Sequence, residues 1–124
     1  MIAVDSSTII DFFAGKTRAD VQLFDANLLA GQIVLPPVVL AEVMSDPRLP
    51  AQHATLLQEL PLLTILGGYW LRAGQSRASI LARKLRARLP NTLIAQSCID
   101  HDVALIQHDG DFESFAKYCG LKLA

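Results

Sequence analysis

Residues 90–112 read Pro-Asn-Thr-Leu-Ile-Ala-Gln-Ser-Cys-Ile-Asp-His-Asp-Val-Ala-Leu-Ile-Gln-His-Asp-Gly-Asp-Phe, and they combine a helix, a strand and an acidic turn. Asn91 is a favourable N-cap residue, which predicts a helix over 92–99. The apolar run 103–106 has the length of a buried strand, and a polar turn with two acids follows it. Acids that follow a buried strand are typical of the ligand-binding edge of an open parallel sheet.

The rest of the chain also alternates short apolar runs with amphipathic segments. We predict strands at 2–4, 33–35, 62–66, 103–106 and 121–123. We predict helices at 6–13, 19–30, 38–44, 51–60, 69–88, 92–99 and 111–117. Alternation of this kind favours parallel strands with helices on both faces. We therefore expect residues 1–124 to form a single three-layer α/β/α domain with a central parallel sheet of about four to five strands.

Composition narrows the class of protein. With 124 residues, 52% apolar and 19% charged, the chain fits one globular domain and not a disordered segment. A net charge of −1 gives no overall attraction to nucleic acid, so any polyanion site must come from local clustering or bound metal. Two cysteines form no disulfide framework, and we find no leader and no membrane-length apolar run. We expect a cytoplasmic protein with free thiols.

Acids near strand ends form the candidate chemical centre. Asp5 follows the predicted strand 2–4, and Glu42 lies about one turn into a predicted helix, while Asp109 and Asp111 follow another strand. Mg²⁺ prefers oxygen ligands, and two such ions would activate a water and stabilise the leaving oxygen of a phosphodiester. The alternative is structural, with Asp5 as a helix cap, Glu42 as an exposed helix residue and Asp109 as a turn former.

Three neighbouring polar residues have the same two interpretations. Asn91 is an ordinary N-cap, and as a metal ligand it offers only a neutral carbonyl oxygen. Ser7 and Thr8 either cap the first helix or orient a metal-bound water or a phosphate beside Asp5.

Basic residues cluster in one segment. Six of the eleven lysines and arginines fall within the predicted helix 69–88. A basic helix face binds RNA phosphates with a strong salt dependence, although such a face is also commonly just solvated. The candidate phosphate-binding residues are Arg72, Arg77, Arg83, Lys84, Arg86 and Arg88.

Four segments in order resemble the PIN-domain family, and among its members the VapC toxins of bacterial type II toxin–antitoxin pairs. They are Ile-Ala-Val-Asp-Ser-Ser at 2–7, Leu-Ala-Glu-Val at 40–43, Asn-Thr-Leu-Ile-Ala-Gln at 91–96 and Ala-Leu-Ile-Gln-His-Asp-Gly-Asp-Phe at 104–112. The resemblance implies a Mg²⁺- or Mn²⁺-dependent endoribonuclease that forms a homodimer. It also implies a VapB-like antitoxin whose C-terminal segment wraps the toxin and reaches its active site.

Within that resemblance, Asp5, Glu42 and Asp109 match three family acids. Asn91 stands where the family has Asp, and Gln107 stands where Thr or Ser is common. The resemblance thus implies a catalytic and metal-binding set at positions 5, 42, 91 and 109, to which spacing adds Asp111 as a metal ligand. The amide at position 91 keeps the shape of Asp but removes a charge, as an engineered inactivation or a natural variation would.

The expected function is cleavage of single-stranded or loop regions of structured RNA such as tRNA or rRNA, where splayed bases are accessible. Asn91 and Gln107 favour an alternative, a non-catalytic PIN-like module that binds RNA or protein. A DNA-directed nuclease of the same fold is a third possibility. Leu49, Tyr69 and Trp70 either pack in the core or line a dimer or antitoxin groove.

Overall fold

The computed structural model describes residues 1–124 and contains three strands, seven α-helices and one short 3-10 helix. The strands are β1 (Ile2–Val4), β2 (Ile33–Val34) and β3 (Leu105–Ile106). The helices are α1 (Ser6–Phe13), α2 (Ala19–Leu29), α3 (Pro37–Met44), α4 (Ala51–Glu59), α5 (Tyr69–Ala82), α6 (Leu89–His101) and α7 (Glu113–Cys119), with the 3-10 helix η1 (Gly110–Phe112) before α7. No helix is both long and apolar enough to cross a lipid bilayer.

The sheet is parallel, with β1 in the centre and the order β2-β1-β3. Ala3 pairs with Val34 on one side and with Leu105 on the other. The predicted strands 62–66 and 121–123 contribute only single bridges, from Leu62 to Leu35 and from Leu123 to Leu105. The predicted parallel sheet is therefore confirmed, but its two edges pair over one residue each and do not form full strands.

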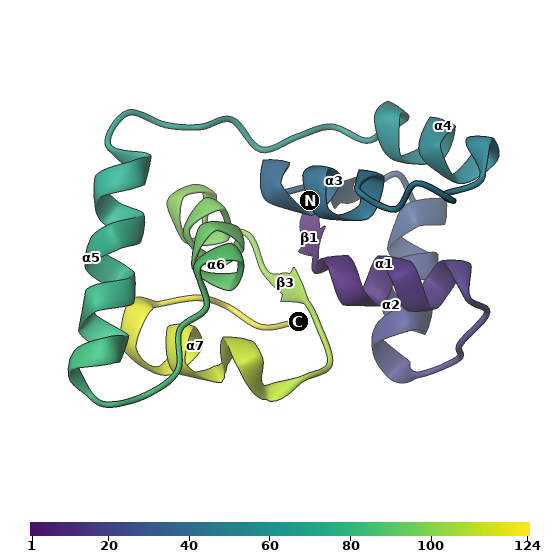
Figure 1. Ribbon diagram of the computed structural model, residues 1–124. Coiled ribbons are helices and arrows are strands. Elements are labelled where there is room, and N and C mark those ends of the chain that lie inside the picture. Colours follow the sequence, from purple (N-terminus) through teal and green to yellow (C-terminus); the bar gives the residue numbers. More distant parts are fainter.

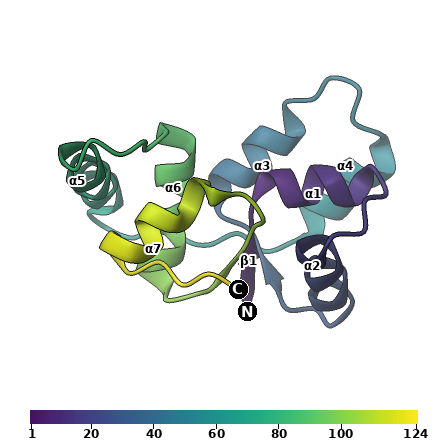
Figure 2. The same cartoon turned by 90° about the horizontal axis from the view of Figure 1, so that it is seen from below.

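Helices lie on both sides of this sheet. In Figures 1 and 2, α1, α2 and α4 lie on one side of β1, and α5, α6 and α7 lie on the other, while α3 lies next to β1 and also contacts α6. A single cluster of 21 buried apolar residues fills the interior, including Phe24 from α2, Leu57 from α4, Ile94 from α6 and Phe115 from α7. The predicted three-layer α/β/α architecture is confirmed.

Two predicted helix boundaries are wrong, and both bear on the candidate site. Helix α5 ends at Ala82 and not at residue 88, because Lys84 has a φ of 59°, a left-handed conformation that cannot continue a helix. Helix α6 begins at Leu89, so Asn91 lies inside its first turn and is not the N-cap, which is Arg88. Pro90 fits that first turn because its missing N–H would have no intrahelical acceptor there.

Candidate active site

Asp5 lies at the carboxyl end of the central strand. Its backbone N–H donates to the carbonyl of Ile106 at 2.9 Å and so continues the pairing of β1 with β3. Asp5 is also the N-cap residue of α1, but its side chain makes no capping hydrogen bond. Instead, Oδ2 of Asp5 accepts a hydrogen bond from the Ser7 hydroxyl at 2.7 Å. The residue is only 6% exposed, which makes it the buried member of the predicted acid set.

Burial raises the pKa of Asp5 above its usual value. Hydrogen bonds from the Ser7 hydroxyl and the Ser6 backbone lower this pKa in part, while the negative charges of Asp109 and Glu42 raise it further. No cation of the chain pairs with Asp5. A buried carboxylate that other acids repel gains most from an added positive charge.

Glu42 faces the start of α1 from the neighbouring helix α3. Its Oε1 accepts a hydrogen bond from the Ser6 hydroxyl at 2.6 Å, although the two residues are 36 positions apart. Two consecutive serines therefore each hold one acid, Ser6 binding Glu42 and Ser7 binding Asp5. Ser6 is not among the site residues predicted from the sequence. Its only signal is its place beside Asp5 in the first turn of α1.

Asp109 shapes the turn after β3. It is the N-cap of η1, and its Oδ1 accepts a hydrogen bond from the backbone N–H of Asp111 at 3.0 Å. This is the turn-forming role considered as the structural alternative. Asp109 nevertheless acts electrostatically on Asp5, so the structural role and membership of the acid group coexist in one side chain.

The acid group does not form a closed metal site. No three Asp, Glu, His or Cys side chains lie close enough together to hold one ion. The donor set is nevertheless chemically suited to a hard divalent cation, because it consists of carboxylates and includes a buried acid with a raised pKa. We refer to Asp5, Glu42 and Asp109 as the sheet-edge acids.

Asn91 lies in a separate small hollow of about 120 Å³. It makes no hydrogen bond to any of the sheet-edge acids. The hollow, which we call the arginine hollow, is lined by Leu85, Arg86, Arg88, Asn91, Gly110, Asp111 and Ser114. The structure thus places Asn91 and Asp111 on the wall of one hollow together with two arginines, and Gly110 of the same wall directly follows Asp109.

Thr8 is unavailable to a substrate, which corrects the prediction made for it. Its side chain is fully buried, and its hydroxyl donates to Oδ2 of Asp20 at 2.8 Å. Ser7 is only partly buried and contacts Asp5, as expected for a residue beside the acid. Consecutive side chains on a helix point in different directions, so Ser7 faces the site and Thr8 does not.

The predicted basic cluster divides into two groups. Arg72 forms an ion pair with Asp100, Arg77 donates to the carbonyl of Ala87 at 2.8 Å, and Arg83 donates to Ser79 and lies over the ring of Tyr118. These three arginines therefore have structural partners. The remaining residues, Lys84, Arg86 and Arg88, are exposed, form no ion pair, and lie in the connection between α5 and α6.

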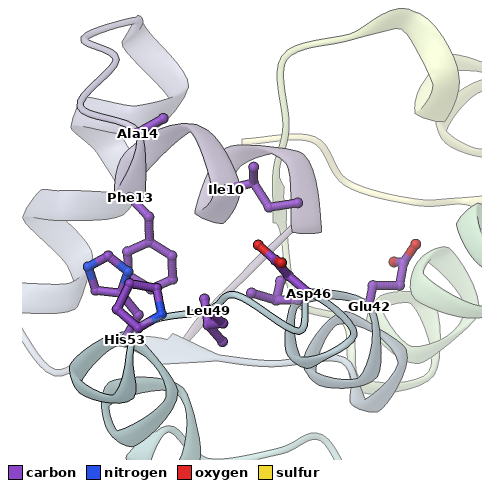
Figure 3. A pocket seen from close by; sticks show the side chains of 9 residues that line it. Ile10, Phe13, Ala14, Glu42, Asp46, Leu49 and His53 are labelled. Carbon is purple, nitrogen blue, oxygen red and sulfur yellow. The ribbon is translucent and has the colours of Figure 1, made fainter.

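An apolar groove of about 300 Å³ lies between α1, α3 and α4 (Figure 3). The ring of His53 stacks on Phe13 with 3.9 Å between ring centroids, and Leu49 lies beside them. Glu42 and Asp46 line the α3 side of the groove, and neither forms an ion pair. The groove therefore connects an apolar surface to one of the sheet-edge acids.

The fold and the acids define a three-layer α/β domain with carboxylates at the carboxyl edge of a parallel sheet. The family model described as the PIN domain matches residues 2–118, and the chain belongs to this family. PIN domains are generally metal-dependent nucleases.

A solved structure shares the fold of this chain. A crystal structure of VapBC2 from Rickettsia felis bound to a DNA fragment from their promoter matches with a TM-score of 0.76. The match is 17% identical in sequence and covers 100% of this chain and 98% of that chain. At this identity the likeness establishes a shared fold. No curated protein sequence matches the chain.

Proposed function

We propose that the chain is a metal-dependent endoribonuclease that acts in the cytoplasm as the toxin of a type II toxin–antitoxin pair. The observation that carries this proposal is the buried carboxylate of Asp5, which has a raised pKa, no cationic partner and two further acids acting on it. Family membership supports a nuclease, and the VapBC2 likeness supports a VapC-type relative.

In this proposal Asp5, Glu42 and Asp109 hold Mg²⁺ or Mn²⁺, with Asp111 as a further ligand. When bound, the metal supplies an activated water and neutralises charge on the scissile phosphate. Ser6 and Ser7 orient two of the carboxylates through the hydrogen bonds at 2.6 and 2.7 Å. Asn91 offers a neutral amide where a carboxylate would strengthen cation binding, so we expect the chain as written to have weak or no activity.

We further propose that the apolar groove binds a segment of a VapB-like antitoxin. An apolar segment fits beside Phe13 and Leu49, and a basic side chain on it would meet the unpaired Glu42 and Asp46. Such an interaction would block the acid set. A homodimer is also proposed, because Trp70 and Leu71 are large apolar residues exposed on the first turn of α5. Leu49 thus has a groove role, whereas Tyr69 packs in the core.

The test is an RNA cleavage assay of the wild-type chain and Asn91→Asp, with Mg²⁺ or Mn²⁺ and with EDTA. Substrates are tRNA, rRNA and a DNA oligonucleotide of matched sequence. We expect cleavage of RNA by Asn91→Asp with metal only, at a rate about 100-fold above the wild-type chain. Cleavage that persists in EDTA would refute the metal mechanism.

One observation favours the alternative of a non-catalytic RNA- or protein-binding module. No three Asp, Glu, His or Cys side chains lie close enough together to hold one ion. This alternative predicts that a folded Asn91→Asp variant gains no cleavage of any substrate in the same assay.

A further inference from the structure

The arginine hollow has the composition of an anion site. Of its seven lining residues, Leu85 is the one with an apolar side chain, and apart from Gly110 the others are polar or charged. Arg86 and Arg88 are exposed and take part in none of the ion pairs of the structure. Guanidinium groups in this state present several N–H donors without protein acceptors and suit planar or tetrahedral oxyanions.

The charge balance of the hollow is set by position 91. Two arginines, Arg86 and Arg88, line the hollow with one acid, Asp111, so its lining residues carry a net positive charge. An aspartate at position 91 would cancel that charge, whereas Asn91 preserves it and adds an amide N–H₂ donor. The backbone N–H of Asn91 in the first turn of α6 also has no intrahelical acceptor, whereas Pro90 has no N–H and the N–H of Thr92 donates to the carbonyl of Arg88.

Size and position are consistent with one phosphate group of a strand. The volume of about 120 Å³ has room for about four water-sized oxygens. The wall of the hollow includes Gly110, the residue directly after Asp109. If a nucleic acid strand lies over the sheet-edge acids, one of its neighbouring phosphate groups can therefore reach the hollow.

From this arrangement we infer that the arginine hollow is a metal-independent subsite for a backbone phosphate of single-stranded RNA, built by Arg86, Arg88, Asn91 and Ser114. This inference rests on the proposed function for the identity of the strand. It gives Asn91 a role of its own, because the amide that weakens the acid set for a cation strengthens the neighbouring hollow for a phosphate. Arg72, Arg77 and Arg83 take no part, because their side chains have protein partners.

The test is fluorescence anisotropy of a labelled, unstructured RNA oligonucleotide with the full chain in EDTA, over a series of salt concentrations. Variants are Arg86→Gln, Arg88→Gln, the double variant and Asn91→Asp, with Arg48→Gln as the control. Arg48 is an exposed arginine in the turn before α4, outside the arginine hollow, so its replacement removes the same charge elsewhere. Thermal melting verifies that each variant is folded, and Arg88→Lys retains the charge if Arg88→Gln is unstable.

We expect the double variant to bind RNA about tenfold more weakly and Asn91→Asp about threefold more weakly than wild type, with Arg48→Gln unchanged. The slope of log affinity against log salt should fall by about 0.7 for each phosphate that a variant no longer neutralises. Equally weakened binding by Arg48→Gln and the hollow variants, or no measurable binding by the wild-type chain, would overturn the inference.

The outcome separates this inference from the proposed nuclease. RNA cleavage by Asn91→Asp with Mg²⁺, combined with unchanged binding by the arginine variants, would remove the subsite and leave the nuclease standing. RNA binding that depends on Arg86 and Arg88, without cleavage by any variant, would support the subsite and refute the nuclease.

Discussion

The acids of this chain fall into two groups that differ in what neutralises them. The arginine-paired acids, Asp11, Asp20 and Asp100, each form an ion pair with Arg18 or Arg72. The Arg72 side chain lowers the pKa of Asp100, and the Arg18 side chain lowers that of Asp11. For Asp20, burial raises the pKa, but hydrogen bonds from Arg18 and Thr8 outweigh it and lower the pKa overall.

The sheet-edge acids have hydroxyl or backbone partners in place of cations. Ser6 and Ser7 donate to Glu42 and Asp5, and the N–H of Asp111 donates to Asp109. Burial raises the pKa of Asp5, and the hydrogen bond from the Ser7 hydroxyl lowers it only in part, because a hydroxyl does not neutralise the charge of a carboxylate. The chain thus neutralises its structural acids with its own arginines and provides no cationic side chain for the sheet-edge acids.

The largest expected difference between the two groups of acids is in RNA cleavage. In an Asn91→Asp background, Asp5→Asn should lower the rate of Mg²⁺-dependent RNA cleavage by about 100-fold or more, because it removes the central carboxylate. The matched substitution Asp11→Asn changes an arginine-paired acid, and we expect less than about a threefold decrease. Single-turnover cleavage rates measure both. Comparable decreases in the two variants would erase the functional distinction between the groups.

The next effect concerns stability. Replacing Arg72 by Ala leaves Asp100, whose side chain is 5% exposed, without its cation. Arg72 itself is 38% exposed, so solvent screening limits the decrease to about 1–2 kcal/mol in the free energy of unfolding. Arg86→Ala should stay within about 0.5 kcal/mol, because Arg86 has no partner. Urea denaturation of both variants tests this, and an equal cost would contradict the division of the basic cluster.

Added metal should distinguish the two groups of acids even without substrate. A divalent cation at about ten times its Kd should stabilise the wild-type chain by about 1.4 kcal/mol, since it binds the folded form. Asp5→Asn should abolish this stabilisation, and Asp20→Asn should retain it. Thermal melts with Mg²⁺, Mn²⁺ and EDTA measure the shifts. Stabilisation that survives Asp5→Asn would place the cation elsewhere.

The smallest expected effect is a pH dependence of opposite sign in the two groups. The folded pKa of Asp5 is raised, so the stability it contributes is full below the unfolded value of 3.8 and is lost as pH rises through the folded pKa. In EDTA near neutral pH, Asp5→Asn should therefore raise the melting temperature by a few degrees, on the order of 1 kcal/mol. This increase should vanish in acid.

Asp100 provides the counterpart in the same experiment. Its folded pKa is lowered, so its contribution is present above the unfolded value of 3.8 and is lost as pH falls through the folded pKa. Asp100→Asn should destabilise the protein near neutral pH, with a smaller difference in acid. Urea midpoints across the acid range measure both trends, and trends of the same sign would mean that the two acids do not differ in their environment.

Much of the fold followed from local patterns. Short apolar runs identified β1, β2 and β3, and helical periodicity located every α-helix, because both signals reside in consecutive side chains. The errors fell at boundaries. A basic, leucine-containing run looked helical through residue 88, but Lys84 takes a left-handed conformation, and α6 starts before the favourable cap at Asn91.

Local sequence patterns were sufficient to predict an α/β chain with acids after its strands and to select Asp5, Glu42 and Asp109 as candidate site residues. Which polar groups became partners depended on how the helices and strands pack. Ser6 meets Glu42 across 36 positions, Arg72 meets Asp100 across 28, and Asn91 joins Arg86 and Arg88 in a hollow of their own. The physical reason is that periodicity depends on neighbours in the chain, whereas hydrogen bonds and ion pairs form between surfaces that packing brings together.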